Sequence, residues 1–187
     1  CGHLVYWPYG SSGTGVPGVN CEHLVPRSSF NDKEPMLSDI HHLRPSWQTW
    51  NSKRSNFPFH TLPDDEVMLW INDVNSQETA PDRNIRGNFT RYGGNSGWEP
   101  WMEQRGDVAR SVLYFYAMYP DQLNNMPGVA DVGSMLDWSD ADPVDARERQ
   151  RNDDVEDAQG NRNPFIDRPD LIHQAYDDLN LDLDWLV

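Results

Sequence analysis

The chain has 187 residues, 37% of them hydrophobic, and a formal net charge of −15 at pH 7. This length predicts one domain with a buried core, and no apolar run approaches the roughly 18 residues that a membrane span needs. Acidic residues outnumber Lys and Arg by 30 to 15, and a surface with that balance repels polyanions at low salt. Composition alone therefore argues against nucleic-acid binding. It fits either an ordinary acidic protein or one adapted to brine, where added salt screens surface charge.

The first half of the chain predicts an irregular arm, two short extended segments and a helix. Residues 1–20 are rich in glycine and aromatic residues, and residues 21–25 are apolar and partly β-branched before Pro26. A second extended segment, within residues 38–46, ends at Pro45. Residues 47–56 contain neither proline nor glycine and predict a helix.

The second half predicts a polar excursion followed by helices. Residues 72–100 are polar and rich in turn-forming residues, which favours a long surface excursion. Residues 107–119 carry apolar side chains around most of the helix axis, so a central buried helix is expected to end at Pro120. Further helices are expected near residues 132–138 and 168–179, separated by an acidic stretch.

The cysteines, Cys1 and Cys21, are compatible with one disulfide that closes the N-terminal segment, or with two free thiols. On the chain-entropy model such a bridge stabilises the fold by roughly 3 kcal/mol. A chain that begins at Cys1 fits a mature secreted form or a trimmed fragment.

An acid directly beside a histidine, Glu22–His23, precedes a helix that carries Asn51 and Arg54. A neutral imidazole accepts a proton from water near pH 7. One carboxylate and one amide oxygen suffice to hold Mg²⁺, which keeps most of its waters. Adjacent strand residues point to opposite faces, so Glu22 and His23 can share a site only at the end or a distortion of a strand.

Four segments resemble, in order, the motifs of the bacterial endonuclease I family. They read "NCEHLVPRSS", "DIHHLRPSWQTWNSKRSNFPF", "RGDVARSVLYF" and "QGNRNPFIDRPDL", and together they run from residue 20 to residue 171. Members of this family are periplasmic or secreted sugar-nonspecific nucleases of the ββα-metal (His-Me finger) superfamily. The resemblance implies an α+β, loop-rich single domain over 1–187, with an N-terminal arm (1–19), a ββα-metal motif (20–57) and a helical scaffold (105–179).

The resemblance also implies roles for individual residues. His23 falls on the general base, and Glu22 and Asn51 fall on the metal ligands, with Mg²⁺ as the expected ion and Mn²⁺ or Ca²⁺ as substitutes. Arg54 is a candidate phosphate contact, although it could equally pair with an acid beside the helix. His42 and Asn56 are expected to support the site, and His41 to be structural.

The strong negative charge departs from the family members, which are mostly neutral or basic. Lys and Arg are needed to neutralise phosphates, so a local basic cleft is one way in which an acidic body could bind nucleic acid. Its expected members lie outside the acidic C-terminal half: Arg27, Arg44, Arg54, Arg83, Arg86 and Arg91. In "RGDVAR" we expect a buried salt-bridge and capping network, and in "GNRNPF" a scaffold turn.

The resulting prediction is a secreted or periplasmic monomer that cleaves DNA, and RNA as well, through contacts with the backbone and leaves 5′-phosphates. Adaptation to high salt is a separate hypothesis, raised by the excess of acidic residues, and an ordinary acidic protein is its alternative. One alternative is an RNA-preferring ribonuclease of the same family, and another is a metal-binding relative without activity. The intact set of Glu22, His23 and Asn51 argues against the last.

Overall fold

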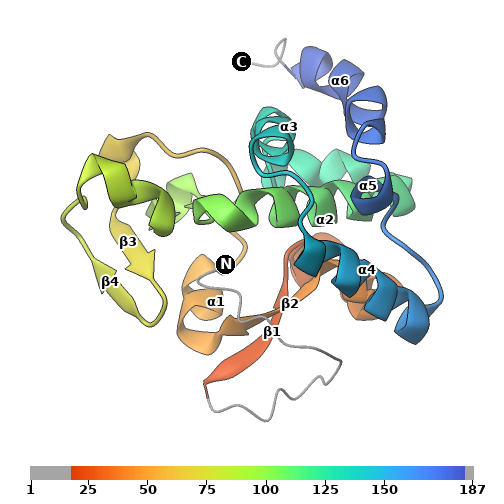
Figure 1. Cartoon of the computed structure of the whole chain (residues 1–187), viewed down its shortest axis with the longest axis horizontal. Coiled ribbons are helices and arrows are strands. Elements are labelled where there is room, and N and C mark those ends of the chain that lie inside the picture. Colours follow the sequence, from red (N-terminus) through yellow and green to blue (C-terminus); the bar gives the residue numbers. More distant parts are fainter. Residues whose placement is uncertain (1–17, 184–187) are drawn as a thin grey trace.

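The computed structural model describes residues 18–183, and its N-terminal part is a ββα unit. Strands β1 (Val19–His23) and β2 (Leu43–Trp47) pair antiparallel, with Cys21 opposite Pro45 and His23 opposite Leu43. Helix α1 (Gln48–Arg54) follows β2 directly (Figure 1). This arrangement brings the end of β1 beside the helix, as the ββα prediction requires.

The connection between β1 and β2 differs in detail from the sequence prediction. The first strand ends at His23, because Leu24 and Val25 leave it and are fully buried in the core. The second segment is extended only from Leu43, since a 3-10 turn precedes it. The Asp39 side chain caps that turn by accepting a hydrogen bond from the amide of His41 at 3.0 Å.

Residues 72–80 are exposed, as expected for the first part of the predicted surface excursion of residues 72–100, but the region contributes to a second sheet. Its strands are β3 (Leu69–Asn72), β4 (Asn75–Gln77), β5 (Thr90–Tyr92) and β6 (Trp98–Glu99), in the order β4-β3-β5-β6 and all antiparallel. These strands were not predicted, because they have two to four residues and too little sequence for an alternating pattern.

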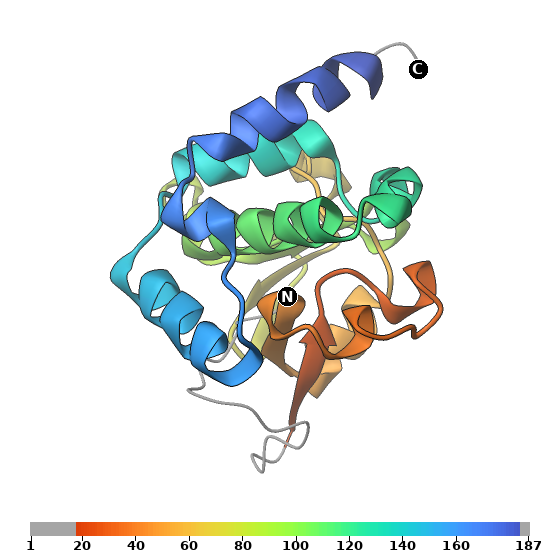
Figure 2. The same cartoon turned by 90° about the vertical axis from the view of Figure 1, so that its right-hand side faces the viewer.

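Helix α2 (Arg105–Met118) is the central element, as predicted, and every residue from Val108 to Tyr116 is buried. Helices α3 (Val132–Ala141) and α6 (Leu171–Leu183) lie on one side of it and the β1–β2 pair on the other (Figure 2). The α+β class is therefore confirmed. Within residues 18–183, no helix combines the length and the apolar character that crossing a membrane demands.

Helix α4 (Ala146–Gln159) was not predicted, because its sequence reads as an acidic surface stretch. Its ends carry the local signals: Asp145 accepts a hydrogen bond from the amide of Glu148 at 2.8 Å, and Gly160 adopts a left-handed φ of 87°. The short helix α5 (Pro164–Asp167) follows and is capped by the Asn163 side chain.

The scaffold role predicted for "RGDVAR" and "GNRNPF" is confirmed. Arg110 donates to both carboxylate oxygens of Glu148, through Nε at 2.8 Å and Nη2 at 2.6 Å. Asn163 donates to the Arg110 carbonyl at 3.0 Å, and Arg105 pairs with buried Glu99 at 2.5 Å. These bonds join α2, α4, α5 and β6.

Candidate active site

Glu22 and His23 lie at the end of β1, the position at which an acid and an adjacent histidine can serve one site. The Glu22 side chain is only 1% exposed, whereas His23 is half-buried and keeps a path to solvent. Because the strand ends at His23, the chain turns away immediately after the pair. This is the arrangement expected from the sequence.

The His23 ring is fixed by a hydrogen bond between Nε2 and the backbone carbonyl of Leu37, at 3.0 Å. A carbonyl can only accept, so Nε2 carries the hydrogen and Nδ1 carries the lone pair. Burial lowers the pKa of His23, and the bond to Leu37 opposes that shift in part. The imidazole is therefore neutral near pH 7 and has one nitrogen ready to accept a proton.

Arg54 is buried and binds the Glu22 carboxylate from the protein interior, so it does not face solvent. Its Nη1 lies 3.0 Å from Glu22 Oε1 and 3.1 Å from the carbonyl of His23, and its Nη2 lies 2.9 Å from the carbonyl of Leu24. Burial raises the pKa of Glu22, and the positive charge of Arg54 acts in the opposite direction.

The predicted phosphate contact of Arg54 does not fit this placement, because the side chain is 1% exposed and both terminal nitrogens are occupied. The alternative, pairing with an acid, describes what Arg54 does. Its partner is the expected metal ligand itself.

Asn51 is oriented by its amide nitrogen, which donates to Asn20 Oδ1 at 2.8 Å and to the Cys21 carbonyl at 3.2 Å. Its Oδ1 receives no hydrogen bond from the described residues and is open as a ligand. One carboxylate and one amide oxygen suit a hard ion that keeps several waters, such as Mg²⁺. In the described part of the chain, no group of three or more His, Cys, Asp or Glu residues is arranged so that it could hold a metal ion by itself. The donor set that Glu22 and Asn51 offer therefore fits Mg²⁺ better than a fully protein-coordinated metal.

His42 supports the site by packing. It is fully buried, its Nε2 lies 2.7 Å from the Met36 carbonyl, and burial lowers its pKa to about 4. The centre of its ring lies 4.8 Å from that of Phe115 on α2 and 5.5 Å from that of His23. His42 thus packs between the central helix α2 and the His23 ring.

The other predicted residues are placed differently. Asn56 is exposed, and among the described residues its side chain is hydrogen-bonded only by Ser55, at 3.4 Å, so the structure does not bring it to the site. His41 is buried, with Nε2 at 3.1 Å from the Asn161 carbonyl, and is structural as expected. Cys21 forms no disulfide within residues 18–183, and burial raises the pKa of its thiol. Its predicted partner Cys1 lies outside the described residues, so the disulfide stays a prediction.

Lys53 is a basic residue of α1 to which the sequence assigned no role. It lies two positions after Asn51 on α1, is half-buried, and its Nζ lies 5.1 Å from the centre of the Tyr92 ring. No acidic partner for it exists among residues 18–183. Lys53 is one of only two lysines in the chain, which is the signal that could have drawn attention to it.

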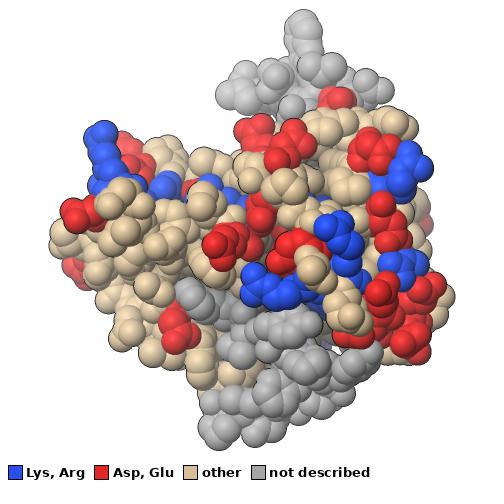
Figure 3. Space-filling model, viewed as in Figure 1, with Lys and Arg blue, Asp and Glu red and all other residues tan. Residues whose placement is uncertain are grey.

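The predicted basic cleft is not formed. Arg44 and Arg54 are buried, while three other members of the predicted set pair with acids: Arg27 with Asp32, Arg86 with Asp64, and Arg91 with Asp64 and Glu99. On the face shown in Figure 3, basic and acidic side chains are interspersed, and acidic groups are densest over α4. Free positive charge near the site is therefore scarce.

A strand-end histidine, a buried acid beside it and an asparagine on the following helix lie together, as the ββα prediction expects. Comparison with known proteins gives the family. The Endonuclease I family model matches residues 8–170. The chain therefore belongs to the Endonuclease I family.

Two curated relatives are extracellular ribonucleases, from Bacillus amyloliquefaciens and from Bacillus subtilis (strain 168). Each is 36% identical over 181 residues, which cover 88% of this chain. The chain spans 56% of the length of each relative.

Proposed function

We propose that this protein is a secreted, Mg²⁺-dependent nuclease that hydrolyses the phosphodiester backbone with little sequence preference. The observation that carries the proposal is the His23 ring, held by the Leu37 carbonyl with Nδ1 free, beside Glu22 and Asn51. Family membership and the extracellular relatives support both the reaction class and secretion.

In the proposed reaction, His23 Nδ1 takes a proton from the water that attacks phosphorus. Glu22 and Asn51 hold Mg²⁺, which when bound offsets negative charge on the phosphate and on the departing 3′ oxygen. Arg54 holds the Glu22 carboxylate in place, and its charge opposes the rise in the pKa of Glu22 that burial causes. Lys53, rather than Arg54, supplies the cation that meets the substrate backbone. As the water oxygen bonds to phosphorus, the P–O3′ bond breaks, the 3′ oxygen takes a proton from solvent water, and the cleaved strand is left with a 5′-phosphate and a 3′-hydroxyl.

RNA is the first substrate to test, because both relatives are named ribonucleases. The competing prediction, equal action on DNA, rests on recognition through the backbone, since phosphate contacts carry no base information. Initial rates on single-stranded RNA, single-stranded DNA and duplex DNA at the same salt concentration separate the two. A ratio of RNA to DNA rates near one supports the sugar-nonspecific enzyme, and a large ratio supports the ribonuclease.

The decisive variant is His23→Ala, with His173→Ala as a matched control on the far side of α2. Loss of the general base is expected to lower the rate of Mg²⁺-dependent cleavage by about 10²- to 10⁴-fold, and the control is expected to retain activity. Chelation of divalent ions should abolish cleavage by the unmodified protein. Full activity of His23→Ala would refute the assignment of the base. Absence of any cleavage by the unmodified protein would favour the metal-binding relative without activity.

A further inference from the structure

A pocket of about 260 Å³ opens on the second sheet, away from the catalytic residues. Its walls combine two aromatic side chains, Trp70 and Phe89, with three amide side chains, Asn72, Asn75 and Gln77. The amide residues are exposed and Phe89 is half-buried, so the polar groups face solvent. The proposed cleavage chemistry uses none of these residues.

The strand register explains why these side chains meet. Asn72 of β3 lies opposite Asn75 of β4, and Trp70 lies opposite Gln77. On the other side of β3, Ile71 pairs with Thr90, which brings Phe89 into line with Asn72. Cross-strand neighbours share one face of a sheet. We call Asn72, Asn75, Gln77 and Phe89 the hairpin platform.

The chemistry of this platform suits an uncharged, planar ligand with hydrogen-bonding edges. Amide side chains both donate and accept, and an aromatic ring offers a stacking surface to any nucleobase. Asp73 also lines the pocket, and a negative charge so close to it disfavours a phosphate. A nucleobase, rather than the backbone, therefore matches the platform.

The platform is tied to the helix that carries Asn51. At the tip of the β3–β4 hairpin, Asp73 accepts a hydrogen bond from Trp47 Nε1 through its carboxylate, at 2.9 Å. Its carbonyl accepts another from Trp50 Nε1, at 2.6 Å. Trp50 directly precedes Asn51 on α1. These indole bonds hold the platform and the metal-ligating asparagine in a fixed relation.

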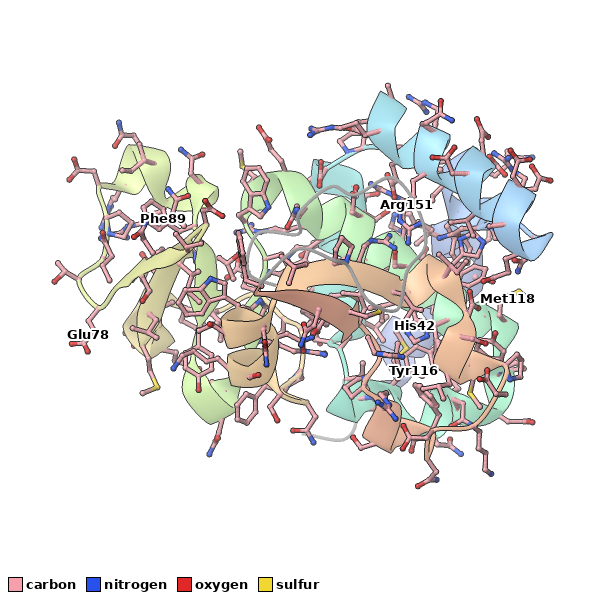
Figure 4. All side chains as sticks on the ribbon, turned by 90° about the horizontal axis from the view of Figure 1, so that it is seen from below. His42, Glu78, Phe89, Tyr116, Met118 and Arg151 are labelled. Atoms are coloured by element: carbon pink, nitrogen blue, oxygen red, sulfur yellow. The ribbon has the colours of Figure 1, made fainter. Side chains whose placement is uncertain are left out.

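Figure 4 shows the candidate active site and the hairpin platform from below, with His42 near the first and Phe89 in the second. A nucleic-acid strand that crosses α1 near Asn51 and Lys53 would run from the active site toward the platform.

We propose that the hairpin platform is a nucleobase subsite, which binds an unpaired base of the substrate strand at a fixed distance from the cleaved phosphate. The inference rests on the proposed nuclease function and adds to it a preference for single strands, because a paired base cannot leave its stack without a cost. The protein would bind the substrate phosphates with few cations and would gain part of its affinity for the substrate from one stacked base.

The test uses Phe89→Ala and Asn72→Ala, with Glu78→Gln as a control on the same exposed hairpin. The substrate is a single-stranded oligonucleotide in which phosphorothioates protect every linkage but one, and a single abasic position is moved along the strand. With the intact strand, Phe89→Ala is expected to lower kcat/KM about 10-fold through KM, with kcat unchanged. Asn72→Ala should lower it less, and Glu78→Gln should leave it unchanged.

The abasic series separates contact with a base from structural damage. At one position, removal of the base should lower the kcat/KM of the unmodified protein by about the same factor. At that position it should not lower the kcat/KM of Phe89→Ala any further. An abasic penalty of equal size in both proteins, or no such position at all, would overturn the subsite.

Binding of a fully phosphorothioate single strand to His23→Ala, with and without Phe89→Ala, tests the subsite without turnover. Weaker binding upon loss of Phe89 supports the subsite even if the assignment of the base to His23 fails. Equal binding rejects the subsite and leaves the nuclease proposal intact.

Discussion

The ββα unit and the helical scaffold each contain a buried arginine–carboxylate pair. The two pairs differ in how many of the carboxylate oxygens the arginine binds. In the scaffold, Arg110 binds both oxygens of Glu148, and neither side chain is more than 1% exposed. In the ββα unit, Arg54 binds one oxygen of Glu22, and the other oxygen receives no hydrogen bond from residues 18–183. Arg54 Nε is also left without a partner.

The difference distinguishes a structural ion pair from one that can serve a site. A carboxylate saturated by a bidentate arginine has no oxygen left for another cation. Glu22 is buried and fixed like a structural group, yet one of its oxygens receives no hydrogen bond from residues 18–183, as the proposed metal site requires. Incomplete pairing of a buried acid is therefore more informative about function than burial or pairing alone.

The largest expected effect comes from the matched variants Glu22→Gln and Glu148→Gln. Glu22→Gln should lower the rate of Mg²⁺-dependent cleavage by about 100-fold or more, because the proposed Mg²⁺ site loses its carboxylate ligand. The negative charge that develops on the phosphate in the transition state would then be stabilised less well. Glu148→Gln should keep activity per folded molecule and lower the free energy of unfolding by about 3 kcal/mol, because buried Arg110 loses the carboxylate that binds it through both oxygens and keeps only one acidic partner among the described residues, Asp107, at the longer distance of 3.6 Å.

Cleavage rates and urea unfolding of both variants make this comparison. Both variants are expected to lose stability, because Glu22→Gln also leaves a buried arginine, Arg54, without its carboxylate. Only Glu22→Gln is expected to lose activity per folded molecule, and equal loss of that activity in both variants would show that the distinction between the two pairs is wrong.

The two lysines give a second comparison, with a smaller effect. Lys53 lies on α1 near Asn51, whereas Lys33 is exposed in the connection that follows β1. Lys53→Ala should raise KM severalfold and reduce the slope of log affinity against log salt by about one, as expected for one phosphate contact. Lys33→Ala should change neither quantity. Equal slopes for Lys53→Ala and the unmodified protein would exclude Lys53 as a phosphate contact.

Much of the site was predictable because its geometry is local. Glu22 and His23 are neighbours, and Pro26 limits the strand, so the acid and the base had to lie near a strand end. The residues that hold them were not predictable in the same way. The Leu37 carbonyl, which fixes the His23 ring, is a backbone group without a sequence signal. Arg54 reaches Glu22 from 32 positions away in the chain.

The fold shows the same division between local and long-range signals. Helix α2 was predicted from its apolar sequence, whereas α4 has almost no apolar face and depends on its caps and on the Arg110–Glu148 pair. The second sheet was missed because its short strands gain stability from cross-strand partners that lie as far apart as Trp70 and Arg91. The hairpin platform depends on that sheet and could not be predicted either.

Salt should affect the surface and the buried pairs differently. The net charge of −15 implies repulsion among surface acids, which added salt screens, whereas buried pairs are screened much less. If the acidity reflects adaptation to brine, thermal stability should rise from about 0.1 M to about 1 M NaCl and cleavage should persist. Loss of both above about 0.5 M NaCl would reject the adaptation, because binding that depends on phosphate contacts weakens steeply with salt.

The smallest expected effect concerns an exposed ion pair that docks α6. His173 lies 3.1 Å from Asp140 of α3 and 2.8 Å from Asp177. Hydrogen bonds to these carboxylates raise the pKa of His173 above its usual value near 6.5. The charged ring is favoured in the folded state, so its contribution is fully present below about pH 6.5 and is lost as the pH rises through the raised pKa.

Because the groups are exposed, this contribution should amount to about 1 kcal/mol or less, well below that of Arg110 and Glu148. The measurement is the urea midpoint of the unmodified protein and of His173→Gln at pH 5.5 and pH 8.5. The difference between the two proteins should be present at the lower pH and absent at the higher one. A difference that is independent of pH would mean that His173 acts through packing, and that only the buried pairs make charge-dependent contributions to the scaffold.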